Sequence, residues 1–465
     1  MILAMKFELS LALILFLLLF LKIDGRAGNV FVIRLTNLLL LLNLALGFFG
    51  NESIEIFGGM FRTSPLLAIE KNILNLAVLL ISLFSYDWLK NHKHLPEFFM
   101  LLVSSLMGFF FMLSSNNLLM FYLGLELSTI PLAALCNFDL EKKVSGEAAM
   151  KMIMSSAFSS AILLFGISML YGTTGSLQFS EISAMLHGSQ LQALGFILFF
   201  TGFAFKLSIV PFHLWTADVY EGSPIAVTAY LSVVSKGAMA FALISVLYTA
   251  FAPMALTWFY VLAVSSAITI TIGNLAAIRQ QNLKRFFAFS SIAQVGYLLI
   301  AISSASQIGV ASVIYFVLIY VFTNLAAFAI ISIISSKTGK ETVNDYKGLY
   351  ASNPTLALIM SLALFSLAGI PPTAGFFGKL FLLTTGAQTG MWWLIIIASL
   401  NLIVSLYYYL RIIRAMFVDE NSEPLGKINL STTALAAVCI CVGGILILGF
   451  VSRTFDVIFQ YAAKF

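Results

Sequence analysis

Runs of about twenty apolar residues, separated by short polar segments, repeat along almost the whole chain. A run of that length crosses the hydrocarbon core of a bilayer as an α-helix. The pattern predicts an all-α integral membrane protein with about fourteen transmembrane helices. The predicted spans cover residues 5–22, 29–49, 65–86, 95–114, 116–136, 147–171, 190–210, 224–250, 254–276, 284–304, 308–334, 354–371 with a continuation to 386, 391–416 and 431–452.

Two of these spans are interrupted by proline. Pro211 breaks the seventh span, and Pro371 and Pro372 break the twelfth, because proline cannot donate the helical hydrogen bond. The breaks are five spans apart, and an odd repeat length inverts the second copy across the membrane. The pattern predicts two inverted five-helix repeats between terminal segments. The predicted domains are a three-helix segment at 1–94, the repeats at 95–250 and 254–416, and a C-terminal helix at 417–465.

Composition agrees with a membrane protein, since 60% of the residues are hydrophobic and only 10% are charged. The net charge of +5 comes from single bases scattered between apolar runs, which does not indicate a nucleic-acid partner. Cys136, Cys439 and Cys441 have no metal-ligand spacing, so we expect membrane-core thiols rather than a zinc or iron–sulfur site.

The distribution of lysine and arginine predicts the orientation. Sixteen of the 25 bases fall in the loops on one side of the predicted spans and five on the other, which also carries both termini. The positive-inside rule therefore predicts that both termini lie on the non-cytoplasmic side. No transit-peptide pattern opens the sequence, which favours a bacterial inner membrane over an organellar one.

Four ionisable residues lie deep within predicted spans: Glu126, Lys206, Lys236 and Lys379. Three isolated lysines would cost on the order of 8–10 kcal/mol in hydrocarbon. A lysine that burial brings toward neutrality can release and regain a proton. The pattern favours a proton relay over structural ion pairs, or over a lysine that snorkels to the interface in the case of Lys379.

Other ionisable residues lie near this set. His213 follows the proline break between two of the lysines and titrates near neutral pH, so we expect it in the relay rather than as a core histidine. Glu147 and Lys151 have i, i+4 spacing, which is typical of a stabilising pair and also suits a proton entrance.

Two further acidic or mixed pairs are interpreted as structural. Asp218 and Glu221 flank the break region, where we expect them to cap and hold the loop. Glu70 and Lys71 open the third span, where we expect them to lie at the membrane interface.

Several long stretches resemble the antiporter-like membrane subunits of respiratory complex I, NADH-quinone oxidoreductase. The resemblance implies fourteen helices with two inverted repeats. It also implies proton translocation, in which the residue at Glu126 pairs with Lys206, His213 and Lys236 continue the path, and Lys379 leads to the far side. Ala217 and Ser235 depart from prolines common in the family. The matching stretches are LLMFYLGLELSTIPL, YGTTGSL, GFAFKLSIVPFHLWTADVYEGSP, GNLAAIRQQNLKRFFAFSSIAQVGYLL and LAGIPPTAGFFGKLFLL.

The chain has no nucleotide-binding motif, so its energy must come from partners or an ion gradient. The resemblance implies that quinone reduction in other subunits drives it, with NAD, FMN, iron–sulfur clusters and quinone bound there and no cofactor on this chain. The implied partners are other membrane subunits of the complex, an antiporter-like neighbour and small subunits among them, and the lipid bilayer. Two alternatives remain open: a subunit of a multi-subunit cation/proton antiporter, and a structural spacer.

Overall fold

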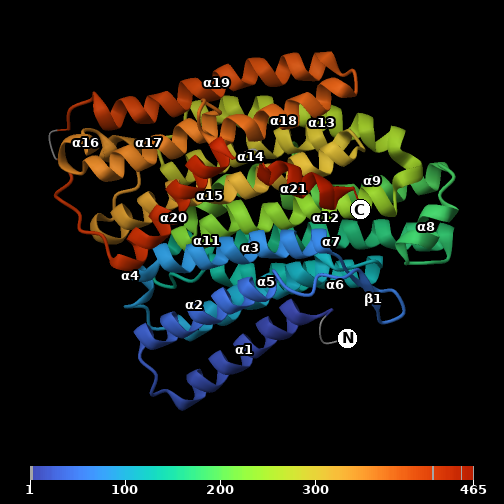
Figure 1. Ribbon diagram of the computed structural model, residues 1–465, viewed down its shortest axis with the longest axis horizontal. Coiled ribbons are helices and arrows are strands. Elements are labelled where there is room, and N and C mark those ends of the chain that lie inside the picture. Colours follow the sequence, from blue (N-terminus) through green and yellow to red (C-terminus); the bar gives the residue numbers. More distant parts are fainter. Residues whose placement is uncertain (1–3, 422–423, 452, 464–465) are drawn as a thin grey trace.

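The chain folds into a bundle of long helices that run roughly parallel or antiparallel to one another (Figure 1). The computed structural model describes residues 4–421, 424–451 and 453–463. In these ranges twelve helical segments are long and apolar enough to cross a membrane. The predicted all-α membrane fold is confirmed. The count of fourteen spans stays a prediction, because it requires that α1 and the α17–α18 pair also cross the membrane. The segments that meet the criterion are α2 (Asn29–Leu46), α3 (Pro65–Phe84), α5 (Leu95–Leu113), α6 (Leu118–Cys136), α7 (Lys143–Thr174), α9 (Gln190–Leu207), α11–α12 (Ile225–Thr249), Ala252–Ile278 with α13 (Ala255–Ile278), α14 (Leu283–Ser303), α15 (Gln307–Thr338), α19 (Trp392–Phe417) and α20 (Thr432–Phe450).

The remaining helices are short or interrupted. The two broken spans predicted from proline are α9 with α10, and α17 with α18. The first helix, α1, carries charges at both of its ends. The bounds are α1 (Lys6–Asp24), α4 (Tyr86–Leu89), α8 (Phe179–Met185), α10 (Leu214–Gly222), η2 (Ala252–Met254), η3 (Val343–Tyr346), α16 (Leu349–Ser352), α17 (Pro354–Ala368), α18 (Ala374–Gln388) and α21 (Arg453–Ala462).

Polar residues at the helix starts explain several of these boundaries. The Ser64 side chain accepts a hydrogen bond from the Leu67 amide at the start of α3, and Asn117 caps α6 in the same way. Ser189 and Gln192 form a capping box at α9. Each cap satisfies amides that the first helical turn leaves free, so the helices begin where the polar segments end.

Glycines let two helix pairs approach closely. A Cβ on Gly108 of α5 would lie 2.3 Å from the Ser128 amide nitrogen of α6. A Cβ on Gly273 of α13 would lie 2.7 Å from the Ala293 amide nitrogen of α14. Real Cβ atoms do not approach backbone atoms so closely, and both pairs therefore depend on the missing side chain.

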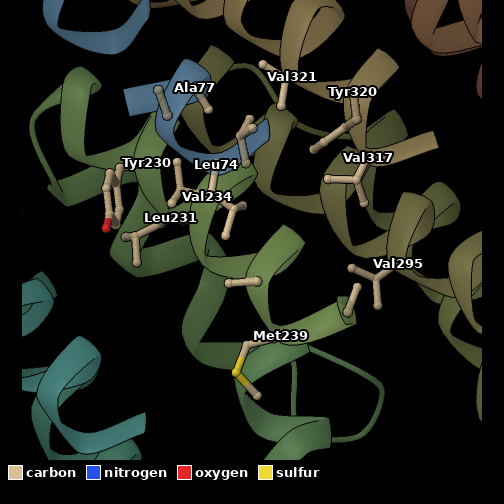
Figure 2. Packing of buried hydrophobic residues seen from close by; sticks show 14 of the residues in the cluster. Leu74, Ala77, Tyr230, Leu231, Val234, Met239, Val295, Val317, Tyr320 and Val321 are labelled. Atoms are coloured by element: carbon tan, nitrogen blue, oxygen red, sulfur yellow. The ribbon is translucent and has the colours of Figure 1, made fainter. Parts of the chain in front are cut away.

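The centre of the molecule is the helix α11–η1–α12, in which a π-helical turn, η1 (Leu231–Ser235), precedes Lys236. Every residue of its apolar window is buried. Figure 2 shows α3 residues Leu74 and Ala77 beside Val234, with Val317 of α15 on the other side. The only lysine of this helix therefore lies inside the protein and not against lipid.

A two-stranded hairpin, β1 (Ile54–Ile56) with β2 (Phe61–Thr63), was not expected from the sequence. It covers the turn between α5 and α6, where the Arg62 amide donates to the Ser114 carbonyl at 2.8 Å. The hairpin lies at the bundle end that also carries both ends of the described chain (Figure 1).

Glu70 and Lys71, which we expected at the membrane interface, lie inside the protein rather than on its surface. Both are buried, with 3% and 1% of their surface exposed. Lys71 Nζ lies 2.5 Å from Glu8 Oε1 of α1 and donates to Ser114 Oγ at 2.6 Å. The pattern of residues along the chain did not indicate that α1 and α5 would close over this end of α3.

Candidate functional site

The predicted break after Lys206 is present and its backbone is satisfied by side chains. α9 ends at Leu207, and Ser208 takes a left-handed conformation with φ of 63°. Trp215 Nε1 donates to the Phe205 carbonyl at 3.0 Å, and the Val210 amide donates to Thr269 Oγ1 at 3.1 Å. Irregular backbone at membrane depth is tolerated where protein groups replace the lost hydrogen bonds.

Lys206 is 6% exposed and points between α6 and α7. Its Nζ donates to Thr129 Oγ1 at 2.7 Å and to Ser156 Oγ at 2.6 Å. Two hydroxyls can solvate either the ammonium or the neutral amine, because a hydroxyl both donates and accepts. This environment suits a lysine that changes its protonation state.

The expected ion pair between Glu126 and Lys206 is not formed. Among the described residues, Glu126 makes no ion pair within 4 Å, and its buried Oε1 has no hydrogen-bond partner. The carboxylate lies one turn before Thr129 on α6 and acts on Lys206 only electrostatically.

Lys236 is 3% exposed and is the first residue after the π turn. Its Nζ donates to Ser291 Oγ of α14 at 2.7 Å and lies 5.5 Å from the centre of the Tyr220 ring. An aromatic face stabilises a cation, and a π turn often marks a functional position in a helix. Ser235 is the last residue of that turn.

His213 lies at the end of the break, 9% exposed, as the residue before α10. Its Nδ1 has no hydrogen-bond partner among the described residues, although the charge of Lys236 acts on it. No hydrogen bond of the described chain links its side chain to Lys206 or Lys236. The predicted relay position is therefore buried, but direct contact with either lysine is missing.

Lys379 is 4% exposed and does not snorkel to the membrane interface. Its Nζ lies 3.3 Å from the Ala368 carbonyl at the end of α17 and 5.2 Å from the Tyr297 ring centre. The lysine also lines a cavity of about 10 Å³ together with Gln294 and Tyr320. That volume holds about one water molecule.

Polar side chains extend from Lys236 toward this cavity. Tyr320 OH lies 3.1 Å from Ser232 Oγ in the π turn, and Asn324 Nδ2 donates to the same hydroxyl at 2.9 Å. Gln294 follows Ser291 by one turn on α14 and lies on the cavity wall. The structure thus brings Lys236 and Lys379 to the two sides of one polar region.

A second, much larger cavity of about 780 Å³ opens at the bundle end that carries α4. Lys151 contacts Glu147 and Asp218 at 2.7 Å each in its wall. The Arg285 guanidinium donates to Asp218 at 2.6 Å and to Glu221 at 2.9 Å. Asp218 and Glu221 therefore tie α10 to α7 and α14.

The environment of Asp218 favours its charged form. Partial burial alone would raise its pKa, but hydrogen bonds and positive charge from Lys151 and Arg285 outweigh that effect. The pKa of Asp218 is therefore held below its ordinary value.

Sequence reasoning missed Lys284 because it counted this residue as an ordinary base of a loop. The side chain is buried, lies 3.1 Å from Glu341 Oε2, and donates to the Ser223 carbonyl at 3.1 Å. A signal was available, since Lys284 precedes Ser291 by seven residues, or two helical turns, on one face of α14.

Fold and site together define a polytopic helical membrane protein with buried lysines beside broken helices. A family model described as NADH:quinone oxidoreductase/Mrp antiporter, TM, matches residues 115–405. NADH-quinone oxidoreductase subunit N of Phocaeicola vulgatus is 46% identical over 462 residues, which is 98% of both chains. The chain belongs to this family of membrane subunits, in its subunit N branch, and the resemblance found in the sequence is confirmed.

More distant relatives agree. NAD(P)H-quinone oxidoreductase subunit 2 of Nostoc punctiforme is 38% identical over 376 residues, 79% of this chain and 70% of the relative. A chain of respiratory complex I from Thermus thermophilus has a TM-score of 0.82 at 30% identity, covering 95% and 96% of the two chains. A chain of the Mrp complex from Dietzia sp. has a TM-score of 0.90 at 21% identity over 100% and 98%, which shows the shared fold alone.

Proposed function

We propose that this chain moves protons across a bacterial inner membrane as one membrane subunit of NADH:quinone oxidoreductase. The observation that carries the proposal is Lys206, which is buried beside a broken helix and, within the described part of the chain, hydrogen-bonded only to two hydroxyls. A buried lysine costs several kcal/mol unless its surroundings solvate it. The two hydroxyls beside Lys206 allow its amine to release and regain a proton, whereas a fixed ion pair would hold it charged.

The proposed path starts at Glu147 and Lys151 on the large cavity and continues through Glu126 and Lys206. From there it follows His213, Lys236 and Lys379 toward the other face. Water must complete the steps that no side chain bridges, as between Lys206 and His213. The buried Glu126 Oε1 and His213 Nδ1, both without partners in the described chain, are atoms that such water would contact.

Moving one proton against about 150 mV requires about 3.5 kcal/mol. The proton affinity of a relay lysine must change by a comparable amount between states. Movement of Glu126 into contact with Lys206 would stabilise the ammonium, and its withdrawal to the position described above would favour release. Quinone reduction in partner subunits is the proposed source of that motion.

The two predicted repeats, 95–250 and 254–416, are proposed as matching halves around these lysines. Ser105 of α5 donates to the Ser128 carbonyl of α6 at 2.9 Å. Ser266 of α13 donates to the Gly296 carbonyl of α14 at 2.7 Å. In each proposed half, a serine hydroxyl of one helix therefore donates to a backbone carbonyl of the next helix. Residues 1–94 and 417–465 are the proposed flanking segments.

NAD, FMN, iron–sulfur clusters and quinone are proposed to bind to other subunits of the assembly. This chain would be positioned by an antiporter-like neighbour and small membrane subunits, with both termini on the non-cytoplasmic side. The alternative, a subunit of a cation/proton antiporter, has the likeness to the Mrp complex in its favour. Deletion of the chain distinguishes them, because only the first assignment requires NADH oxidation in membranes to disappear.

Replacement of Lys206 by alanine tests the relay. We expect Lys206→Ala to lower the protons pumped per electron in membrane vesicles that contain an assembled complex, because the exchangeable amine is gone. Lys93→Ala, at an exposed residue between α4 and α5, is the control and should pump normally. Unchanged pumping in Lys206→Ala at normal complex content would contradict the proposal.

A further inference from the structure

We propose that Lys284, Ser223 and Tyr220 form a separate proton inlet that leads from the large cavity directly to Lys236. This inference rests on the proposed proton translocation and adds a branch that bypasses Glu126 and Lys206.

The inlet begins at an ion pair in the cavity wall. Lys284 and Glu341 both line the cavity, and their charged atoms are 3.1 Å apart. Glu341 also accepts a hydrogen bond from Ser335 at 2.8 Å. The side chain of Lys284 is 8% exposed and that of Glu341 is 23% exposed, so the carboxylate faces water while the lysine points inward. A proton taken up by Glu341 would reach Lys284 without leaving the pair.

Two buried hydroxyls continue inward from this pair. Lys284 Nζ donates to the carbonyl of Ser223 at 3.1 Å, and Tyr220 lies one turn earlier on α10. Ser223 is 1% exposed and Tyr220 is 0% exposed. Neither Ser223 Oγ nor Tyr220 OH makes a hydrogen bond of full geometry in the described chain, although Ser223 interacts with the Cys136 thiol and Tyr220 with the hydroxyls of Ser291 and Ser232. Buried hydroxyls rarely stay unpaired, and ordered water is the usual partner.

The inner end of the inlet is Lys236. Its ammonium lies over the Tyr220 ring, 5.5 Å from the centre, and donates to Ser291. Ser291 follows Lys284 by two turns on the same face of α14, a rise of about 10 Å. The hydroxyls of Ser223 and Tyr220 therefore lie between Lys284 and Lys236.

Proton transfer along this line needs no other reactant. Lys236 first releases its proton to the Lys379 side. Charged Lys284 then passes its proton to neutral Lys236 through water held by Ser223 and Tyr220. Glu341 takes a proton from the cavity and returns it to Lys284, which restores the ion pair and the first state of each group.

Two substitutions test the inlet in the assembled complex. Lys284→Arg keeps the positive charge and the ion pair but cannot release a proton at physiological pH. Tyr220→Phe keeps the ring and removes the hydroxyl. We expect each to slow NADH-driven proton uptake about tenfold or more. The controls are Lys142→Arg, at an exposed residue in the same cavity wall, and Tyr230→Phe, whose hydroxyl donates to Ser105 elsewhere; both should keep normal uptake.

The outcomes separate the two proposals. Normal uptake in Lys284→Arg and Tyr220→Phe, with loss in Lys206→Ala, overturns the inlet and leaves the proposed function standing. Normal uptake in all three overturns the proposed function. If Lys284→Arg lowers the complex content, Tyr220→Phe normalised to NADH oxidation by an artificial electron acceptor decides the question.

Discussion

At the residue scale, the buried charges are solvated in different ways. Lys206 has two hydroxyls, Lys236 has a hydroxyl and a ring face, and Lys379 has a carbonyl and a ring face. Lys71 differs because it is paired with Glu8 and lies 5.4–5.6 Å from the ring centres of three phenylalanines. The first three lysines can lose a proton without leaving a carboxylate unpaired. Lys71 cannot, so we assign it to stability.

Lys71→Met is expected to destabilise the chain by about 3–5 kcal/mol, because it leaves Glu8 buried without its partner. Adding Glu8→Gln should recover part of that loss. Thermal unfolding of the detergent-extracted complex measures both. Lys90→Ala, which removes a partly exposed pair with Asp87, is the control and should cost about 0–1 kcal/mol. Equal losses in the single and double variants would contradict this assignment.

At the scale of elements, the short helix α10 is held to its neighbours by charge. Asp218 lies between Lys151 of α7 and Arg285 of α14. Apolar runs and proline breaks predicted the long helices from the sequence alone. The ion pairs around α10 did not follow from it, because they join residues 64 to 67 positions apart.

The pH dependence of stability tests this attachment. The lowered pKa of Asp218 means that its contribution is complete above the ordinary carboxyl pKa of about 3.9. The contribution is lost as the pH falls through the lower folded-state value. We expect Asp218→Asn to melt at a lower temperature than the original chain at pH 7, and the difference should shrink toward pH 3. A difference that stays constant over this range would show that Asp218 does not act through its charge.

Several other features of the site could not be predicted from the sequence, for physical reasons. The burial of Lys206, Lys236 and Lys379 could be predicted, because apolar runs flank each residue. Their partners could not, since Ser156 and Ser291 resemble ordinary helix-packing serines. The hairpin β1–β2 was missed because it is too short for a strand pattern.

At the scale of the whole molecule, two tightly packed helix pairs, α5–α6 and α13–α14, lie in the proposed halves. In each pair a glycine brings the two backbones together, as at Gly108 and Gly273. The central helix α12 contacts α5 of the first pair and α14 of the second. Separation of either pair would therefore disturb the surroundings of Lys236.

Gly108→Ala and Gly273→Ala should each destabilise the chain by about 1–3 kcal/mol, because the added methyl meets backbone that cannot yield. Gly172→Ala in α7 meets nothing within 4 Å and is the matched control. It should be neutral or stabilising by up to about 1 kcal/mol, since alanine favours helix more than glycine does. Thermal unfolding compares the three, and equal stability would contradict the role of close approach.

The π turn before Lys236 has a consequence for the direction of that side chain. A regular α-helix advances about 100° per residue, and a π turn contains one residue more than a regular turn. The extra residue among Leu231–Ser235 therefore sets the angular phase of everything that follows it on α12. Without it, the amine of Lys236 would be rotated by roughly a quarter of a circle, away from Ser291.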